Sequence, residues 1–235
     1  NLFDLEKCFD SVDLPTLHKA LEENEFPEID KNMGLQVHLA PRCIQVQAAC
    51  AEPVEITTGM LAGCIRSVPM LKSLVRKRMQ VLVKRCKKAG TKIYIDDVAQ
   101  IITGSFEEVN KEAVSGALEF AKLARYCKMK LSTKSKCVCS NRKLGKLIVK
   151  ELNNLGVCIG LATSARDLGI TFTAGGIRDS RLAFKRAQKS ISRVKKIASL
   201  SKFARSARRL YTSGAHPQGL WGQAAVGISP TAEVK

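Results

Sequence analysis

Residues 92–103 read KIYIDDVAQIIT, in which two short apolar runs flank Asp96 and Asp97. Runs rich in Ile, Val and Tyr around a polar pair predict a β-hairpin that turns at the aspartates. A two-residue turn prefers Asn-Gly or Asp-Gly because its central residues need positive φ, so Asp-Asp is a poor choice for the turn. Adjacent like charges also repel, and local rules broken in this way often mark a functional site.

A bound divalent cation would remove this repulsion, and carboxylate oxygens are ligands that suit Mg²⁺. The alternative is a solvated acidic turn, and the hairpin alone does not decide between the two. A second acidic segment opens the chain, where NLFDLEKCFDSVD places Asp4 after an apolar strand start and Phe9 five residues later.

Charge is distributed unevenly along the chain, whose formal net charge is +18. Residues 1–60 hold eleven acids and four bases, so the excess of positive charge lies in the remainder. Residues 72–88 contain eight Lys or Arg and no acid, and residues 178–209 contain twelve Lys or Arg and one acid. Such clusters are typical of proteins that bind a phosphate backbone. The alternatives are a solvated basic face without a partner and an anionic membrane surface.

The apolar pattern predicts an α+β fold that ends in helices. Helices are predicted at 15–25, 69–88, 106–127 and 144–155, and a further amphipathic helix contains residues 184–198. Strands are predicted at 2–5, 136–139 and 168–172, in addition to the hairpin; residues 35–50 suggest strands or an irregular connection. The polar face of the last helix carries four basic residues: Lys185, Lys189, Arg193 and Lys196.

The nine cysteines are an odd number in scattered positions, which favours an intracellular protein with reduced thiols over a disulfide framework. The sequence does not distinguish nucleus from cytoplasm. No run of eighteen apolar residues occurs, so no membrane span is expected. The three histidines, His18, His38 and His216, are too dispersed for a metal cluster. Because the chain starts at Asn1 inside an apolar run, we expect it to be a segment of a longer polypeptide.

Six segments in order resemble motifs of reverse transcriptases. FDLEKCFDSV is similar to their first palm motif, ITTGMLAGCIRSVP to the glycine-rich second motif, and IYIDDVA to the Tyr-x-Asp-Asp hairpin. LSTKSK resembles the fourth motif with its lysine, ARDLGI the short Leu-Gly strand at the palm's edge, and RLYTSGAHPQGLWGQ the thumb of non-LTR retrotransposon enzymes. One departure is Leu61-Ala62-Gly63, which stands where the family has Pro-Gln-Gly.

The resemblance implies a right-hand polymerase palm, an antiparallel sheet with helices, at residues 1–176 with residual fingers elements. Residues 177–235 would be the start of a helical thumb. Because the chain begins three residues before Asp4, we expect the fingers to be missing and the 235 residues alone to be inactive. The implied function is RNA-directed DNA polymerase of a retroelement. Two alternatives remain: a degenerate or domesticated relative that binds nucleic acid without polymerising, and a basic structural module whose Asp-Asp turn is incidental.

The implied reaction joins a nucleotide to a primer 3′-hydroxyl with the help of two Mg²⁺ ions, with Mn²⁺ as an alternative. Asp4 and Asp96 are expected to bridge the metals, Asp97 to support one of them, and the Leu5 carbonyl to add a ligand. Phe9 would be the steric gate that excludes a ribose 2′-hydroxyl and so favours DNA synthesis. Its alternative is an ordinary core phenylalanine.

The remaining site residues are expected to contact nucleotide, primer or template. Gly59 and Gly63 would let the backbone approach nucleotide or template closely, and Lys134 would lie near the triphosphate or, alternatively, on a solvated face. Tyr94 would pack beneath the primer end or in the core. The expected partners are an RNA template, a DNA primer or duplex and deoxynucleotides, with an oligomeric state that the sequence does not indicate.

The predicted thumb adds a second, sequence-independent contact with nucleic acid. The basic face formed by Lys185, Lys189, Arg193 and Lys196 would follow the backbone of a duplex. Tyr211 and Trp221 are expected to be core anchors of this region rather than platforms for base stacking.

Overall fold

The computed structural model describes residues 1–95, 97–175 and 179–223, and the chain forms two compact units. The first unit comprises Asn1–Cys137 with Asn141–Leu161, and the second begins at Ala162 and includes Val138–Ser140. Helices and a sheet together build the first unit, which confirms the predicted α+β class. The predicted boundary between palm and thumb, at residues 176 and 177, stays a prediction.

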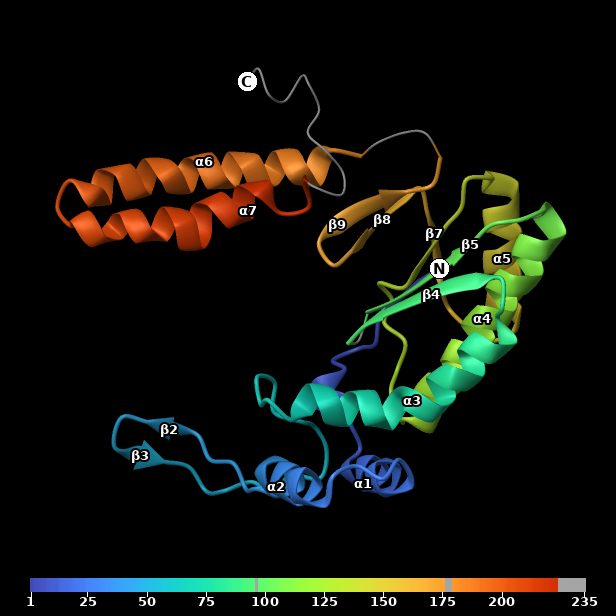
Figure 1. Ribbon diagram of the computed structural model, residues 1–235, viewed down its shortest axis with the longest axis horizontal. Helices are drawn as coiled ribbons and strands as arrows, with labels where there is room; N and C mark the ends of the chain where they lie inside the picture. The colour runs from blue at the N-terminus through green and yellow to red at the C-terminus, as the bar shows by residue number, and fades with distance from the viewer. Residues whose placement is uncertain (96, 176–178, 224–235) are drawn as a thin grey trace. The chain divides into compact units, whose positions relative to one another are not determined.

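A five-stranded sheet organises the first unit, with its strands in the order β4–β5–β1–β6–β7 (Figure 1). The strands are β1 (Leu2–Phe3), β4 (Ala89–Tyr94), β5 (Asp97–Ile102), β6 (Lys136–Val138) and β7 (Gly160–Ala162). The first strand, β1, pairs antiparallel with β5 on one side and with β6 on the other. The start of the chain is therefore inserted between strands that come from its middle.

Five helices belong to this unit: α1 (Leu14–Glu23), α2 (Glu28–Leu39), α3 (Ser67–Arg85), α4 (Phe106–Tyr126) and α5 (Arg142–Asn154). Local capping fixes where two of them begin. The Asp13 side chain accepts a 3.0 Å hydrogen bond from the N–H of Thr16 at the start of α1. Ser105 and Glu108 form a capping box at the start of α4.

Helix α4 packs on one face of the sheet through aromatic stacking. The rings of Phe3 in β1 and Phe120 in α4 lie with their centroids 4.5 Å apart and nearly parallel. Both residues are almost completely buried, at 2% and 0% exposure. Large buried aromatic side chains contribute strongly to a core, so this contact fixes which face of β1 points toward the helices.

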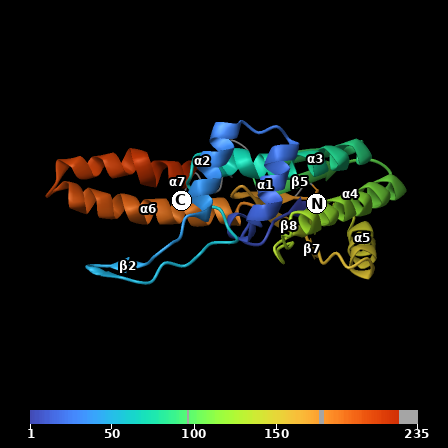
Figure 2. The same ribbon diagram turned by 90° about the horizontal axis from the view of Figure 1, so that it is seen from below.

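The four helices predicted in this unit are confirmed, with ends that differ by at most three residues. The prediction for residues 35–50 is wrong in part, because α2 extends to Leu39 and only β2 (Gln45–Val46) and β3 (Ala49–Cys50) are strands. Apolar residues of α2 are exposed, Ile29 at 75% and Val37 at 41%, so this helix lacks the regular buried stripe that predicts a helix. The β2–β3 ribbon extends away from α1 and α2 in both views (Figures 1 and 2).

The second unit combines a hairpin with a helical part. Strands β8 (Ser164–Asp167) and β9 (Ile170–Thr173) pair antiparallel, which confirms the strand predicted near residues 168–172 in part. The predicted amphipathic helix is α6 (Arg181–Ser201), followed by a 3-10 turn (Arg205–Arg208), a π-helical turn (Tyr211–Ala215) and α7 (His216–Leu220). Helix α7 returns beside α6 (Figure 2), and the Ser190 hydroxyl donates a 2.7 Å hydrogen bond to the Ala215 carbonyl.

Tyr211 and Trp221 are not the core anchors that the sequence predicts, because they are 42% and 56% exposed. The indole N–H of Trp221 instead donates a 3.2 Å hydrogen bond to the Leu168 carbonyl.

Among the described residues, no helix combines the length and the apolar character needed to cross a membrane.

Candidate functional site

The strand register brings Asp4 and Asp97 together. Leu2 lies opposite Ala99 and Phe3 opposite Val98, so the same register continued by one residue sets Asp4 opposite Asp97. Directly opposed residues of antiparallel strands have Cβ atoms about 4.5–5.5 Å apart. Asp97 is also paired with Tyr94 across the hairpin. Tyr94 and Asp97 are thus cross-strand partners, and the continued register adds Asp4, the residue directly after β1, beside them; these three residues are called the acidic row below.

The hairpin itself is confirmed, but its turn differs from the prediction. Because Tyr94 pairs with Asp97, Asp97 is the first residue of β5 rather than part of the turn. Ile95 has a positive φ of 57°, a conformation that is strained for a β-branched residue. Asp96, the third predicted carboxylate, lies outside the described residues.

The acidic row faces away from the core. Successive side chains of an extended strand point to opposite faces, and Phe3 and Leu5, on either side of Asp4, are only 2% and 5% exposed. Asp4 is half-buried, and Tyr94 is 59% exposed. Because Phe3 stacks on α4, Asp4 lies on the opposite, open face of the sheet. The exposure of Tyr94 also excludes the core role that was its alternative.

The main chain of Asp4 is fixed on both sides by the turn at residues 132–135. The Asp4 N–H donates to the Ser135 hydroxyl at 3.1 Å, and the Ser132 N–H donates to the Asp4 carbonyl at 2.9 Å. Lys134 is exposed on this turn, where its own N–H donates to the Ser132 hydroxyl at 3.1 Å. The predicted catalytic aspartate and the predicted triphosphate lysine are thus joined through one short turn.

Leu5, predicted to offer its carbonyl to a metal, is buried and forms an isolated bridge with Leu131. The two hydrogen bonds of this bridge run from the Glu6 N–H to the Lys130 carbonyl and from the Ser132 N–H to the Asp4 carbonyl. Neither bond uses the Leu5 carbonyl, so the pairing does not occupy the predicted ligand atom.

The segments that resemble the first and second motifs pair directly with each other. The Met60 N–H donates a 2.7 Å hydrogen bond to the Phe9 carbonyl, and the Gly59 N–H donates a 2.8 Å bond to the Val12 carbonyl. Phe9 is half-buried at the start of a short 3-10 helix, Phe9–Ser11. Gly59 and Gly63 both have positive φ, 93° and 90°. Phe9 is thus neither a core residue nor fully exposed. The segment from Gly59 to Gly63, called the glycine loop below, fixes the backbone of Phe9 through the bond from Met60.

His38 is a residue of this region that the sequence did not indicate. It is fully buried on α2, where its Nδ1 accepts a 3.2 Å hydrogen bond from the Leu61 N–H at the start of Leu61-Ala62-Gly63. The Ser67 hydroxyl donates a 2.7 Å bond to the Leu61 carbonyl. Burial, with a smaller contribution from the Arg42 charge, lowers the pKa of His38. A lone histidine near the end of a helix carries no signal of this contact, because the contact is tertiary.

The basic residues between Lys72 and Lys88 are only partly available to a partner, because four of the eight contact other side chains. These four contacts are Lys77 with Glu23 (3.3 Å), Arg85 with Glu119 (2.6 Å), Lys88 with Glu108, and the Arg78 guanidinium over the Tyr126 ring (4.4 Å). Lys72, Arg76, Lys84 and Lys87 form no ion pair with any described residue. The phosphate-binding capacity of this helix is therefore smaller than its sequence suggests.

In the second unit, the four predicted duplex contacts on α6 are all exposed: Lys185, Lys189, Arg193 and Lys196. Between them in sequence, Arg186 is half-buried, and its guanidinium donates a 3.3 Å hydrogen bond to the Trp221 carbonyl. The helix thus has an exposed basic face, and a fifth basic residue, Arg186, has a structural contact that the sequence did not indicate.

The predicted metal site involves three carboxylates, of which Asp96 lies outside the described residues. Within residues 1–95, 97–175 and 179–223, no three His, Cys, Asp or Glu side chains gather closely enough to hold a metal ion. Two of the three predicted carboxylates, Asp4 and Asp97, lie in these ranges, and the donor set that they offer suits Mg²⁺.

Comparisons of the chain with models of known protein families and with curated proteins find no match.

Proposed function

We propose that this chain is the catalytic core of an RNA-directed DNA polymerase of the reverse transcriptase type, with Asp4, Asp96 and Asp97 as its metal-binding residues. The observation that carries the proposal is the register of β1 and β5, which pairs Leu2 with Ala99 and Phe3 with Val98 and, continued by one residue, would set Asp4 opposite Asp97. Two-metal nucleotidyl transfer needs carboxylates that converge from separate strands. The order of the six motifs along the chain supports the same function.

Two bound metal ions would lower the pKa of the attacking 3′-hydroxyl and neutralise the leaving pyrophosphate. The chain's own contribution is to hold the carboxylates in place. The Asp4 main chain is bonded at both its N–H and its carbonyl, so its side chain extends from a fixed backbone, as a preorganised site requires. Lys134, on the same turn, would donate to the triphosphate, and the exposed ring of Tyr94 would support the primer end.

Phe9 would select the sugar. Its carbonyl is held by the 2.7 Å bond from the Met60 N–H, and the residue is half-buried. A phenylalanine ring on this fixed backbone would collide with a ribose 2′-hydroxyl and accept a deoxyribose. The product would then be DNA.

A second candidate function is nucleic-acid binding without polymerisation, by a degenerate or domesticated relative. Ala62 favours it, because the family has a glutamine at this position. The exposed basic face of α6 would serve either function. The two candidates differ only in catalysis, so the test must measure binding and incorporation separately.

The experiment compares Asp97→Asn with wild type in primer extension by the polypeptide that carries this chain, with an RNA template, a DNA primer and Mg²⁺. We expect incorporation to fall on the order of 100-fold or more, because metals contribute several kcal/mol to the transition state, while duplex binding stays unchanged. Glu107→Gln removes an exposed carboxylate at the start of α4 and should keep full incorporation. Near-normal incorporation by Asp97→Asn would exclude the acidic row from catalysis, and absent incorporation by wild type with intact binding would favour the second candidate.

A further inference from the structure

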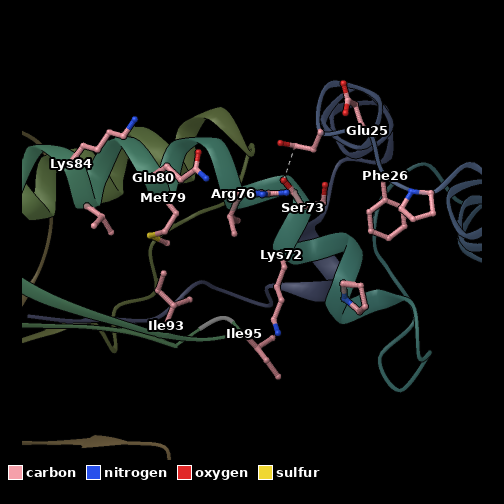
Figure 3. Close-up of a pocket in the computed structure, with 15 residues that line it drawn as sticks. Glu25, Phe26, Lys72, Ser73, Arg76, Met79, Gln80, Lys84, Ile93 and Ile95 are labelled. Atoms are coloured by element: carbon pink, nitrogen blue, oxygen red, sulfur yellow. Dashed lines mark hydrogen bonds between the residues drawn. The ribbon is translucent and has the colours of Figure 1, made fainter.

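An open groove of about 860 Å³ lies in the first unit between α3, the end of β4 and the loop that joins α1 to α2. Its floor is aliphatic and includes Met79 and Ile93, which face one another across the groove (Figure 3). Val83 and Ile93 are 47% and 44% exposed, while Met79 is buried. The volume lies within the range of ligand sites in proteins.

Helix α3 contributes two parallel stripes to this groove. Val75, Met79 and Val83 follow one another at intervals of four residues and form the apolar stripe. Lys72 and Arg76 begin a second stripe at the same interval, which continues through Gln80 to Lys84. Residues four apart lie on the same side of a helix. At 1.5 Å per residue the basic stripe is about 18 Å long, and the apolar stripe runs beside it for about 12 Å.

Among the described residues, no acid forms an ion pair with the basic stripe. Lys72, Arg76 and Lys84 are exposed and form no ion pair with a described residue, in contrast to Lys77, Arg85 and Lys88 on the same segment. One acid, Glu25, lines the groove at the end that also holds Phe26 (Figure 3). The groove therefore combines an apolar floor with a mainly cationic rim.

We infer that this groove binds an acidic amphipathic helix of a partner protein. Apolar side chains at intervals of three and four would pack on Met79, Val83 and Ile93, while acids on the flank would meet Lys72 and Arg76. A helix of about twelve residues spans the roughly 18 Å of the basic stripe and covers the whole of the shorter apolar stripe. Aliphatic and thioether side chains suit such a partner, whereas single-stranded nucleic acid stacks on aromatic rings, and Phe26 is the one aromatic residue among those that line the groove.

The groove is distinct from the acidic row. Ile93 lies opposite Val98, which in turn lies opposite Phe3, so Ile93 shares the face of the sheet that packs on α4. Asp4, Asp97 and Tyr94 belong to the other face. The inference does not depend on the proposed polymerase function, because a partner could bind behind the hairpin whether or not the open face is catalytic.

The test measures binding of a fluorescent helical peptide of about 14 residues, with Leu on one face and Glu on the other, to the 235-residue chain at about 0.15 M salt. Arg76→Glu and Val83→Asp should each weaken binding by about tenfold. Lys87→Glu makes the same charge change at an exposed residue outside the groove and should alter binding less than about twofold. A peptide with Lys in place of Glu should bind more tightly to the double variant Lys72→Glu/Arg76→Glu than to the wild-type chain.

Four results would overturn the inference. A scrambled peptide of the same composition that binds equally well would show attraction to net charge alone, as would equal losses from Arg76→Glu and Lys87→Glu. If an oligothymidine displaces the peptide, and if Arg76→Glu also weakens binding of the oligothymidine, the groove would be assigned to nucleic acid. Self-association of the chain that Val83→Asp abolishes would assign it to a second copy. Circular dichroism of each variant verifies the fold, and all four substituted residues are exposed.

Discussion

Gly59 lies against the main chain of Asp10: a Cβ at position 59 would come within 3.0 Å of the Asp10 carbonyl oxygen. This approach joins the glycine loop to the segment that carries Phe9. Gly63 has the same positive φ but no described atom within 4 Å of the corresponding Cβ position. The two glycines of one motif thus have different structural reasons to be glycine, and they provide a matched pair of variants.

We expect Gly59→Ala to be more destabilising than Gly63→Ala. Both variants place a side chain at positive φ, which costs about 1–2 kcal/mol, but only Gly59→Ala adds a collision with the Asp10 backbone. The measurement is the free energy of unfolding from urea denaturation. Equal losses would show that the loop moves away from Asp10 at little cost.

Phe9→Val should reduce discrimination against ribonucleotides by about tenfold or more, since the 2′-hydroxyl would no longer meet the ring. The measurement is kcat/KM for a ribonucleotide and its deoxy counterpart in primer extension. Phe106→Val, at a 45% exposed residue at the start of α4, is the control and should leave the ratio unchanged. An unchanged ratio in Phe9→Val would make Phe9 a packing residue.

Reversing Lys189 and Arg193 to Glu should weaken duplex binding for all sequences alike. Two lost phosphate contacts reduce the slope of log K against log salt by about 1.8. The double variant Lys146→Glu/Lys150→Glu changes two exposed residues at the same spacing on α5 and should keep the wild-type slope. Sequence-selective loss would contradict contact with the backbone.

The stability of the glycine loop should fall in mild acid because of His38. Burial lowers the pKa of His38 below its usual 6.5, so the unfolded chain binds a proton before the folded chain does. The contribution of His38 to the free energy of unfolding is therefore fully present above pH 6.5. It is lost as the pH falls from 6.5 through the lower pKa that His38 has in the folded state. Protonation would also remove the acceptor of the Leu61 N–H.

The measurement for His38 is the difference in unfolding free energy between pH 7.5 and pH 5.5, for wild type and for His38→Asn. The variant should lose part of the wild-type pH dependence. His18→Asn alters an exposed histidine that lies 3.4 Å from Glu22 and serves as the control. An identical pH profile for wild type and His38→Asn would show that His38 does not titrate in this range.

Gln100→Met should stabilise the first unit. Gln100 is 3% exposed on β5, and neither its Oε1 nor its Nε2 has a hydrogen-bond partner among the described residues. It packs on Gly116, where an added Cβ would lie 2.4 Å from Gln100 Oε1. Replacing an unsatisfied buried amide with an apolar side chain of similar shape should gain about 1–3 kcal/mol. A loss of stability would point to a water molecule that satisfies the amide.

Helices of this chain were predictable where buried apolar residues recur along one face at intervals of three and four. Leu14, Leu17 and Leu21 of α1 are all nearly fully buried, and their spacing alone indicates the helix. Helix α2 was missed because its apolar residues are largely exposed. The residues of the acidic row were identified from sequence, but their proximity depends on β1, a strand of two residues that is too short to reveal its partners.

The glycine loop shows the same limit. Its glycines were identified as positions where backbone approaches something closely, and Gly59 indeed has a close neighbour. The neighbour in the structure is the backbone of Asp10, whereas the sequence pointed to a nucleotide or template. The contact of His38 with Leu61 could not be predicted, because the two residues belong to different segments and no pattern in the sequence indicates that these segments lie together.

The pairing of Leu2 with Ala99 and Phe3 with Val98 has a consequence for how this gene can vary in length. Side chains alternate between faces, so one residue inserted between Leu2 and Phe3 would turn Phe3 toward solvent and Asp4 toward α4. The β2–β3 ribbon has only exposed residues in its ladder and no face to misplace. Among descendants of this gene, insertions and deletions should therefore accumulate in the ribbon and be eliminated from the segment that leads to Asp4.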